Sequence, residues 1–390
     1  MRFPEFSGEW ECSTIGSEFE LYSGNTPSRL DKEQFNGNVN WISSGELKEH
    51  YIYDTKEKIT EEAASCNNLR LLPIGTFVIA IYGLEAEGVR GTGSVIQKKS
   101  TISQACMAFS SKGAITNEFL YSWYKKHGNF IGLKYAQGTK QQNLSYDIIS
   151  QFRISYPSIT EQKKLEDFIS LIDERLATQN KIIEDLKKLK SSISKQVFAQ
   201  EPNGWSRLDT LFSKGKAGGT PTSTNKEYYN GEIPFLSIND ITKQGKYVRY
   251  TENYLSQSGL ENSSAWVVPK YSLIMSMYAS VGLVTINEIP ITTSQAMFAM
   301  QLKDKDLLDY LYYYLSYFKY RHIHKYLETG TQSNINADII RGIMIPIYGH
   351  SRNMEIASTL QGIDVKIDNE LSVLKLFNRQ KNYLLSQMFI

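Results

Sequence analysis

A pair of neighbouring hydroxyl and amide side chains occurs twice in this sequence, about half a chain length apart. Ser103 and Gln104 follow one predicted strand, and Ser294 and Gln295 follow another. A side-chain amide donates and accepts hydrogen bonds at once, which suits the edge of adenine, whereas hydroxyls serve bases and phosphates alike. These residue types in a repeated pattern favour reading of DNA over catalysis. The same groups also cap turns and sheet edges, so for any single residue both interpretations stay open.

Further candidates for DNA contact lie in matching loops of the two halves or beside them. Gln141 corresponds to Gln332 in a glycine-containing loop, and Tyr82 corresponds to Tyr278 at the end of a strand. The other polar or small candidates are Ser43, Gly219, Thr220, Ser237, Asn239 and Thr331.

Basic residues cluster locally although the formal net charge of the chain is only +2. Between Gly88 and Tyr146 the only acid is Glu118, and the stretches 241–251 and 310–327 hold basic residues without any acid. A charge run is usually a solvated face, yet its recurrence in both halves favours phosphate contacts on one basic side of the molecule. The basic candidates are Arg90, Lys134, Lys140, Lys216, Lys243, Arg249 and Arg321.

No residue constellation for catalysis or for a cofactor stands out. The run 214–220 resembles a phosphate cradle but lacks the glycine-lysine-serine order at P-loop spacing. His322 and His324 lie two positions apart, which places them on different faces of a helix, and no cysteine or carboxylate cluster completes a metal site. Asp54 and Glu57 belong to a loose carboxylate-lysine group, which keeps a nuclease as a rival interpretation. We therefore expect neither a metal nor a cofactor in this chain.

The stretch 158–200 predicts a long amphipathic helix. Its apolar residues step by three and four positions, Ser158 and Glu161 have the spacing of a capping box, and Pro202 closes the far end. About 40 helical residues make a rod of roughly 60 Å, which cannot bury its own apolar stripe. Residues 350–390 repeat the stripe. The two helices are therefore expected to pack as an antiparallel coiled coil.

The two halves of the chain repeat one sequence pattern, and repeats of this kind determine the architecture. The matching segments keep an unbroken order and include 26–27 with 220–221, 76–82 with 272–278, and 172–173 with 363–364. Apolar runs predict strands at 76–82, 273–277 and 297–302 and helices at 117–127 and 306–326. The sequence thus predicts two repeated mixed α/β domains, at 1–157 and 201–349, separated by spacer helices at 158–200 and 350–390.

Cysteine usage and hydropathy indicate a compartment. The three cysteines, Cys12, Cys66 and Cys106, are an odd number without paired spacing, which favours a reducing environment. No signal peptide and no apolar run long enough to span a membrane is present, so we expect a cytoplasmic protein without a membrane partner. The abrupt start at Met1 leads us to expect that a few residues are missing upstream.

The order of these motifs resembles a known family. Residues 218–222, followed by 228–231 and 233–241, are similar to the opening motif of a target-recognition domain of type I restriction-modification DNA specificity subunits. Residues 2–10 and 23–28 look like the first such domain of the family, and 160–164 looks like the start of its central spacer helix. The resemblance covers essentially the whole chain. Because the first copy has a single glycine before Asn25 where the second has a pair, the two domains are expected to read different half-sites.

The resemblance implies a subunit that is not itself catalytic. Each target-recognition domain would bind one half of a bipartite site in double-stranded DNA, while the helices set the spacing and dock two methyltransferase subunits. Those subunits would supply S-adenosylmethionine for adenine methylation, and restriction subunits, where present, would add cleavage that depends on ATP and Mg²⁺. The alternatives are a coiled-coil scaffold that joins two protein-binding heads and a stand-alone nuclease.

Overall fold

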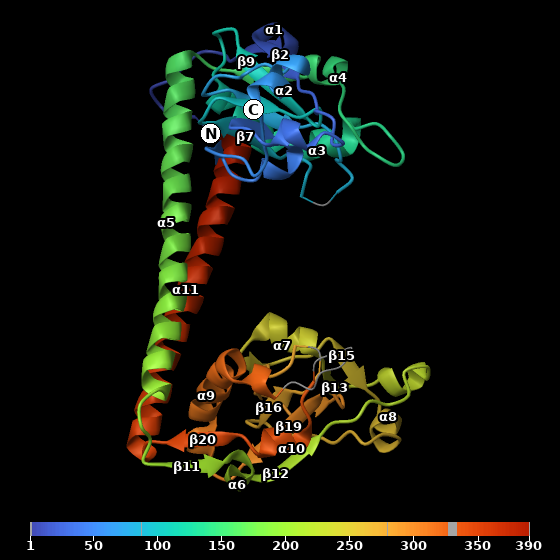
Figure 1. Ribbon diagram of the computed structural model, residues 1–390, viewed down its shortest axis with the longest axis vertical. Helices are drawn as coiled ribbons and strands as arrows, with labels where there is room; N and C mark the ends of the chain where they lie inside the picture. The colour runs from blue at the N-terminus through green and yellow to red at the C-terminus, as the bar shows by residue number, and fades with distance from the viewer. Residues whose placement is uncertain (1, 87, 279, 327–333, 390) are drawn as a thin grey trace. The chain divides into compact units, whose positions relative to one another are not determined.

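This computed structural model describes residues 2–86, 88–278, 280–326 and 334–389. The chain divides into two compact units: unit 1 comprises Met1–Asn180 and Ser372–Ile390, and unit 2 comprises Lys181–Leu371. Each unit combines a mixed α/β domain with part of two long helices (Figure 1).

The domain of unit 1 contains three sheets in its described part. The five-stranded sheet has, in spatial order, β2 (Phe19–Ser23), β9 (Cys106–Ser111), β6 (Phe77–Ala80), β7 (Gly93–Ile96) and β4 (Tyr51–Ile52). A three-stranded sheet has the order β5 (Lys58–Ile59), β3 (Val39–Ile42) and β8 (Ser100–Ile102). A two-stranded sheet pairs β1 (Glu11–Thr14) with β10 (Arg153–Tyr156). Only the pairs β4–β7 and β3–β8 are parallel among these described strands.

The domain of unit 2 repeats this topology strand for strand. Its five-stranded sheet has the order β12 (Phe212–Ala217), β19 (Met297–Leu302), β16 (Leu273–Ser276), β17 (Val284–Asn287) and β14 (Tyr247–Val248). A three-stranded sheet has the order β15 (Asn253–Leu255), β13 (Ile233–Leu236) and β18 (Thr292–Thr293). A two-stranded sheet pairs β11 (Gly204–Arg207) with β20 (Met344–Ile347). Here too the β14–β17 and β13–β18 pairs are parallel. Equal strand order and pairing direction confirm the repeat that the sequence predicts.

One helix in each domain covers the five-stranded sheet: α3 (Asn117–Tyr135) in unit 1 and α9 (Leu308–Arg321) in unit 2. The shorter α-helices are α1 (Ile15–Glu18), α2 (Glu61–Cys66), α4 (Tyr146–Ser150), α6 (Leu208–Leu211), α7 (Ile238–Gln244), α8 (Gln257–Glu261) and α10 (Ala337–Arg341). In unit 1, Phe77 of β6 contacts Tyr124 of α3 with ring centroids 5.9 Å apart. Burial of each such large side chain contributes roughly 1.5–3 kcal/mol, so this interface is a main source of domain stability.

The bounds of these two helices differ from the sequence prediction. Helix α3 continues past residue 127 to Tyr135. Helix α9 is shorter than the predicted 306–326, because His322 has a φ of −128°, outside the helical range, and the chain continues as a 3-10 turn at Ile323–Lys325. This turn lets Ile323 enter the core of unit 2, where it is 9% exposed.

The two long helices are α5 (Ile159–Phe198) and α11 (His350–Met388), and their segments within each unit run antiparallel. In unit 1, the first half of α5 meets the last half of α11, where Lys381 Nζ lies 2.5 Å from Asp173 Oδ1. In unit 2, the order is reversed, and Lys190 of α5 pairs with Asp364 of α11 at 2.5 Å. Because these helix halves share the core of a domain, each compact unit includes helical segments that the sequence-based division kept apart from the domains.

The start of α5 shows half of the predicted capping box. The Glu161 N–H donates to Ser158 Oγ at 3.4 Å, as the motif requires. The Glu161 carboxylate, however, accepts two hydrogen bonds from the Arg2 guanidinium, at 2.7 and 2.6 Å. This bidentate pair ties the beginning of the chain to the helix in unit 1.

Candidate nucleic-acid interface

The turn between β8 and β9 is held between two other strand ends in unit 1. The Ser103 N–H donates to the Ile42 carbonyl at the end of β3 at 2.8 Å. The Ile81 N–H, just after β6, donates to the Ala105 carbonyl at 2.9 Å. Gln104 lies between these two anchor points and is exposed. Its amide is therefore presented to solvent from a rigid base.

The segment that follows α3 lies beside the same end of β6. Tyr82 and Asn143 form an isolated antiparallel bridge, so Gln141 lies in the loop next to Tyr82. Arg90 comes from the β6–β7 loop, and its side chain packs directly on Gly132 of α3. Two loops distant in sequence thus meet at one edge of the domain.

Unit 2 has the same construction. The Met277 N–H, just after β16, donates to the Ala296 carbonyl at 2.7 Å, and the Ile335 N–H donates to the Met277 carbonyl at 3.1 Å. Gln295 and Tyr278 therefore occupy the positions that Gln104 and Tyr82 hold in unit 1. Tyr278 is 42% exposed and Tyr82 is 38% exposed, so both rings are accessible.

Exposed candidates gather at these two places. The unit 1 edge consists of Tyr82, Gln104, Lys134, Lys140 and Gln141. The unit 2 edge consists of Thr220, Asn239, Lys243, Tyr278, Gln295 and Arg321. Both edges combine amide, aromatic and cationic groups, which can read bases, stack and hold phosphates. Contact of each of these residues with DNA stays a prediction.

Several serine candidates have a structural role at the edges. The Ser43 N–H and hydroxyl both bond to Glu46 Oε2, at 2.9 and 3.2 Å. The Ser237 hydroxyl bonds to Asp240 Oδ2 at 2.7 Å in the same capping-box geometry. Ser103 is only 3% exposed. These side chains shape the loops that carry the exposed candidates.

Three further candidates also have partners within the protein. The Ser294 hydroxyl accepts a hydrogen bond from the amide two residues on, at 3.3 Å. Arg90 Nη1 donates to the Leu84 carbonyl at 3.0 Å, and Lys216 Nζ donates to the Ser264 carbonyl at 3.3 Å. Lys216 remains exposed, so its charge still faces solvent.

Gly219 lies buried in unit 2, although its type and neighbours make it a candidate for DNA contact. Its N–H donates to the Thr293 carbonyl at 2.9 Å. A methyl group at this position would overlap the Ser264 side chain and the Ala265 backbone nitrogen. The glycine is needed for this close approach of two backbone segments, which places the exposed Thr220 at the unit 2 edge.

We expect Gly219→Ala to destabilise unit 2 by about 1–3 kcal/mol in the absence of DNA, because the added methyl overpacks a rigid contact. Urea denaturation of the chain without DNA measures this effect. The control is Gly204→Ala, because a Cβ there meets nothing within 4 Å. Equal stability of the two variants would show that the packing at Gly219 is not tight.

Two basic candidates of unit 2 carry charges that carboxylates partly balance. The Lys243 ammonium pairs with Glu252, and this hydrogen bond raises the pKa of Lys243. Arg249 Nε lies 2.7 Å from Glu288 Oε2, and that hydrogen bond raises the pKa of Arg249. Both side chains stay cationic at neutral pH. A DNA phosphate would have to compete with these carboxylates.

Arg249 lies apart from the unit 2 edge. It follows β14, which runs parallel to β17, so Arg249 is level with Glu288 beyond the end of β17. Strand β16 is antiparallel to β17 and ends at the opposite side of the sheet, where Tyr278 follows it. The strand register therefore separates Arg249 from the other candidates.

The basic segment between Gly88 and Tyr146 does not form one continuous basic face. Lys98 pairs with Asp54 at 3.7 Å, and Lys112 Nζ donates to the Gly16 carbonyl at 2.9 Å. Lys125 is largely buried, which lowers its pKa to about 8. The basic residues of this segment that belong to the unit 1 edge or pack beside it are Arg90, Lys134 and Lys140.

Thr331 and Gln332 lie outside the residues that the structure describes. Glu85 is exposed beside the unit 1 edge, and the sequence argument misses it because it lies just before the basic segment that starts at Gly88. Its carboxylate accepts the Gln142 N–H at 2.8 Å, which lowers the pKa of Glu85. A carboxylate can accept a hydrogen bond from cytosine. An acidic residue in the loop after β6 is therefore also a sequence signal for DNA contact.

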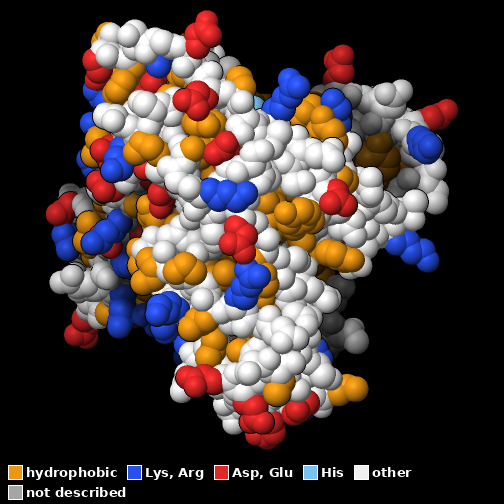
Figure 2. All heavy atoms as spheres, turned by 90° about the horizontal axis from the view of Figure 1, so that it is seen from above, with side chains coloured by type: hydrophobic (Ala, Val, Ile, Leu, Met, Phe, Trp, Pro, Cys, Tyr) orange, Lys and Arg blue, Asp and Glu red, His pale blue; other side chains and the backbone are white. Residues whose placement is uncertain are grey.

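The surface and the side-chain clusters set further bounds. On the face shown in Figure 2, acidic and basic side chains are interspersed with hydrophobic ones. Within the described ranges, no group of three or more histidine, cysteine, aspartate or glutamate side chains could hold a metal ion. Among the helices of those same residues, none is long and apolar enough to cross a membrane.

The fold and the edges together define a protein with two copies of one α/β domain, each presenting polar and basic side chains at the same strand ends. The chain belongs to the family of type I restriction modification DNA specificity domains, whose model matches residues 7–188 and again residues 202–374. The two matches coincide with the two repeats.

The chain is also similar to curated proteins named as specificity subunits of type I restriction enzymes. The chain is 25% identical over 259 residues to the specificity subunit of type I restriction enzyme MjaIX from Methanocaldococcus jannaschii, covering 60% of this chain and 59% of that protein. It is 27% identical over 185 residues to the EcoR124I/EcoR124II specificity subunit from Escherichia coli, covering 46% and 44%. The aligned part thus spans less than two thirds of either relative.

Solved structures share the fold over nearly the whole length. The S subunit of a type I restriction-modification system from M. genitalium has a TM-score of 0.59 at 16% identity, covering 100% of this chain and 99% of that chain. A chain from a study of complex assembly and conformational transition of the type I R-M system has a TM-score of 0.66 at 15% identity, covering 98% of each chain. At these identities, the likeness shows the fold.

Proposed function

We propose that this chain is the DNA specificity subunit of a type I restriction-modification complex, in which each domain reads one half of a bipartite site. The observation that carries the proposal is the repetition of one polar edge in two domains of the same fold. The amide, hydroxyl and basic side chains at both edges match the groups that read base edges and hold phosphates. Membership of the family supports the same role.

In this proposal, α5 and α11 set the distance between the half-sites and dock two methyltransferase subunits. Exposed apolar side chains on these helices support docking, because such surfaces commonly mark protein interfaces. Leu171 and Leu376 are each 59% exposed, and Leu189 is 49% exposed. All three would be covered when a partner subunit binds.

The chemistry belongs to the partner subunits in this proposal. The chain itself is not catalytic, and the methyltransferase subunits bring S-adenosylmethionine and methylate adenine. Restriction subunits, if present, contribute the steps that need ATP and Mg²⁺. The complex would act on cytoplasmic DNA.

Mapping of methylated adenines tests the proposal. We expect cells that express the chain with its methyltransferase to methylate a split motif with two unlike halves and a fixed spacer. The halves should differ because the two edges carry different side chains, such as Lys140 and Gln141 in unit 1 and Arg321 in unit 2. Methylation without a split motif would contradict the proposal, and absence of any DNA footprint would favour a protein-binding scaffold.

Substitution of the matched glutamines should act on one half-site each. We expect Gln104→Ala to weaken discrimination at one base pair of one half by ~1 kcal/mol, about fivefold, because an amide that contacts a base edge is lost. Gln295→Ala should act in the same way on the other half. Competition binding with a library of site variants measures both effects.

The control for these variants is Gln196→Ala, which changes an exposed glutamine of α5 outside both edges. It should leave preference at every position unchanged. If Gln104→Ala and Gln295→Ala relaxed the same half-site, the assignment of one domain to each half would be wrong.

A further inference from the structure

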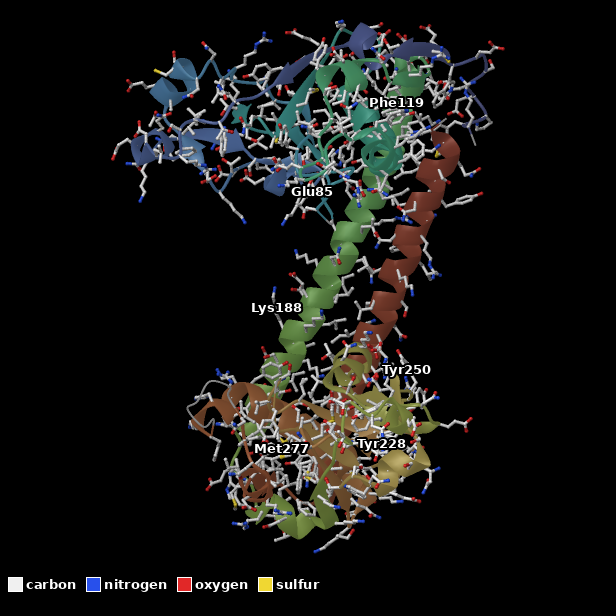
Figure 3. The ribbon with its side chains drawn as sticks, turned by 90° about the vertical axis from the view of Figure 1, so that its right-hand side faces the viewer. Glu85, Phe119, Lys188, Tyr228, Tyr250 and Met277 are labelled. Atoms are coloured by element: carbon white, nitrogen blue, oxygen red, sulfur yellow. The ribbon has the colours of Figure 1, made fainter. Side chains whose placement is uncertain are left out.

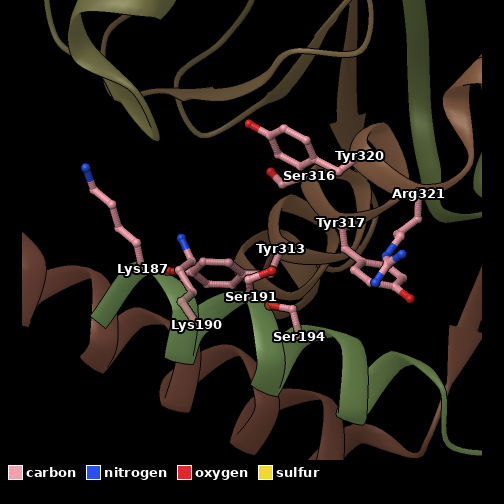
Figure 4. Close-up of a pocket in the computed structure, with 9 residues that line it drawn as sticks. All are labelled: Lys187, Lys190, Ser191, Ser194, Tyr313, Ser316, Tyr317, Tyr320 and Arg321. Carbon is pink, nitrogen blue, oxygen red and sulfur yellow. The ribbon is translucent and has the colours of Figure 1, made fainter. Parts of the chain in front are cut away.

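Unit 2 contains a basic cavity of about 330 Å³ between α5 and α9. Lys187, Ser191 and Ser194 line it from α5 (Figure 4). The lining residues from α9 include Ser316 and Arg321. We propose that this cavity binds a backbone phosphate of the DNA held at the unit 2 edge, an inference that rests on the proposed function.

The side chains of the cavity suit a phosphate group. Lys187 and Arg321 lie at its two ends in Figure 4, and both are exposed. Within the described part of the chain, neither forms an ion pair with a carboxylate. Between them, the hydroxyls of Ser191, Ser194 and Ser316 supply donors for phosphate oxygens. Cations at both ends and hydroxyls between them match the groups that usually hold DNA phosphates.

One cation of the cavity already has a structural partner. Lys190 lies 2.5 Å from Asp364 Oδ1, and the Tyr313 hydroxyl donates to Asp364 Oδ2 at 2.9 Å. These bonds fix the wall of the cavity where α5, α9 and α11 meet. Lys190 therefore contributes less free charge than Lys187 or Arg321, which are the residues that we assign to the phosphate.

The internal repeat supplies an independent comparison. The junction of the two long helices with α9 in unit 2, here called a corner, has a counterpart in unit 1, where the long helices meet α3. Phe389 of unit 1 contacts Phe119 with ring centroids 5.1 Å apart, as Phe198 of unit 2 contacts Tyr310 at 6.2 Å. The Lys381–Asp173 ion pair likewise corresponds to the pair between Lys190 and Asp364. The framework of the two corners is thus conserved between the repeats.

The two corners differ at the positions that line the cavity. In the register that aligns Phe389 with Phe198, Asn378 replaces Lys187, Leu385 replaces Ser194, and Phe130 replaces Arg321. Leu385 is 7% exposed and belongs to the core of unit 1. At two further lining positions unit 1 has lysines, because Lys125 replaces Ser316 and Lys126 replaces Tyr317. The serine hydroxyls of the cavity are therefore not repeated in unit 1, and the shared packing does not require them.

The position of Arg321 identifies the source of the phosphate. Arg321 ends α9, and its neighbours Lys319 and Ile323 pack at Gly282, in the loop that starts at Tyr278 of the unit 2 edge. A duplex bound at that edge would therefore pass the mouth of the cavity that Arg321 lines. Tyr320 also lines the cavity and is 79% exposed, which leaves the mouth open to a large ligand. A phosphodiester continuous with the bound half-site can therefore reach Lys187 on α5.

The test uses the full chain assembled with its methyltransferase subunits and a duplex that carries the methylated motif. We expect Lys187→Ala to lower the slope of log affinity against log salt by about 0.9, the value for one lost phosphate contact. Ser194→Leu, which introduces the residue of unit 1, should fill the cavity and produce a similar loss. The ratio of affinities for the true motif and a scrambled duplex should stay unchanged in both variants.

The matched control is Lys188→Ala, because Lys188 is the next residue of α5 and is oriented toward Glu184 and Asp185, 3.9 and 3.6 Å away (Figure 3). It should leave the salt slope unchanged. Methylphosphonate substitution of single phosphates then locates the contact: one neutral linkage should weaken wild-type binding and leave Lys187→Ala unaffected. If no linkage distinguishes the two proteins, or if Lys188→Ala changes the slope as Lys187→Ala does, the phosphate site is wrong.

Two outcomes separate this inference from the proposed function. If the wild-type complex prefers its split motif and Lys187→Ala changes neither slope nor linkage pattern, only the phosphate site fails. If the wild-type complex shows no preference for any split motif, the proposed function itself fails. Displacement of DNA from the wild type but not from Lys187→Ala by ATP at constant ionic strength would assign the cavity to a free nucleotide and overturn the inference.

Discussion

Replacing Phe389 with alanine should lower the free energy of unfolding of unit 1 by about 3–5 kcal/mol, the usual cost of a large-to-small change at a buried aromatic side chain. Phe389 is 1% exposed although it lies just past the end of α11. Its ring packs on Phe119 of α3, which Figure 3 labels, with ring centroids 5.1 Å apart. Lys126 also donates hydrogen bonds to the carbonyls of Phe389 and Ser386.

Hydrogen exchange resolved by mass spectrometry measures this loss, because it reports unit 1 and unit 2 separately. Amides of α3 should exchange faster in Phe389→Ala, whereas amides of α9 should not change. Leu376→Ala is the control, since Leu376 lies on the same helix and is 59% exposed. If the two variants exchanged alike, the end of α11 would not be anchored in the core of unit 1.

Replacing Asp364 with alanine should destabilise unit 2 by about 3 kcal/mol. Asp364 accepts hydrogen bonds from Lys190 and from Tyr313, and the side chains of Asp364 and Lys190 are 25% and 28% exposed. Removal of one partner of a fully buried pair costs about 3–5 kcal/mol, and exposed pairs are worth about 0–1 kcal/mol. Asp364 is partly buried, and its removal leaves the Tyr313 hydroxyl without an acceptor. The expected cost therefore lies at the lower end of the range for buried pairs.

The measurement is again exchange of the amides of α9, now with two comparisons. Asp364→Asn keeps an acceptor oxygen for Tyr313 and should lose less stability than Asp364→Ala. Asp338→Ala removes an 89% exposed carboxylate that pairs with Arg341, so its effect should be close to zero. Equal effects of Asp364→Ala and Asp338→Ala would show that the joint between α5, α9 and α11 contributes little to the stability of unit 2.

The sequence predicts the architecture closely because its signals are local or come from comparison of the chain with itself. The helix expected at 158–200 runs over Ile159–Phe198, and the strand expected at 297–302 is Met297–Leu302. The two helices that cover the sheets are predicted less accurately. Helix α3 continues past residue 127 to Tyr135, and the helix expected at 306–326 ends early, where Ile323 packs in the core. Tertiary packing there outweighs the local helical pattern.

The candidate DNA-contacting residues fall into two groups for a similar reason: those whose exposure the sequence predicts, and those whose burial or position it does not. Gln104 and Gln295 are exposed at equivalent turns, as expected from residues that follow equivalent strands. Residue type alone does not show that Gly219 is packed against backbone or that Arg249 lies at the far end of its sheet. Burial and position of that kind depend on strand register, which the spacing of residues within one segment does not specify.

The amino-acid sequence by itself determined that this protein has two copies of one mixed α/β domain and two long amphipathic helices, since periodicity and internal repetition are properties of the chain alone. Only the tertiary structure decided which side chains meet. Lys381 joins Asp173, and Lys187 and Arg321 line the same cavity, because helices distant in sequence pack together. Long-range packing places these side chains at shared sites, and no local pattern carries that information.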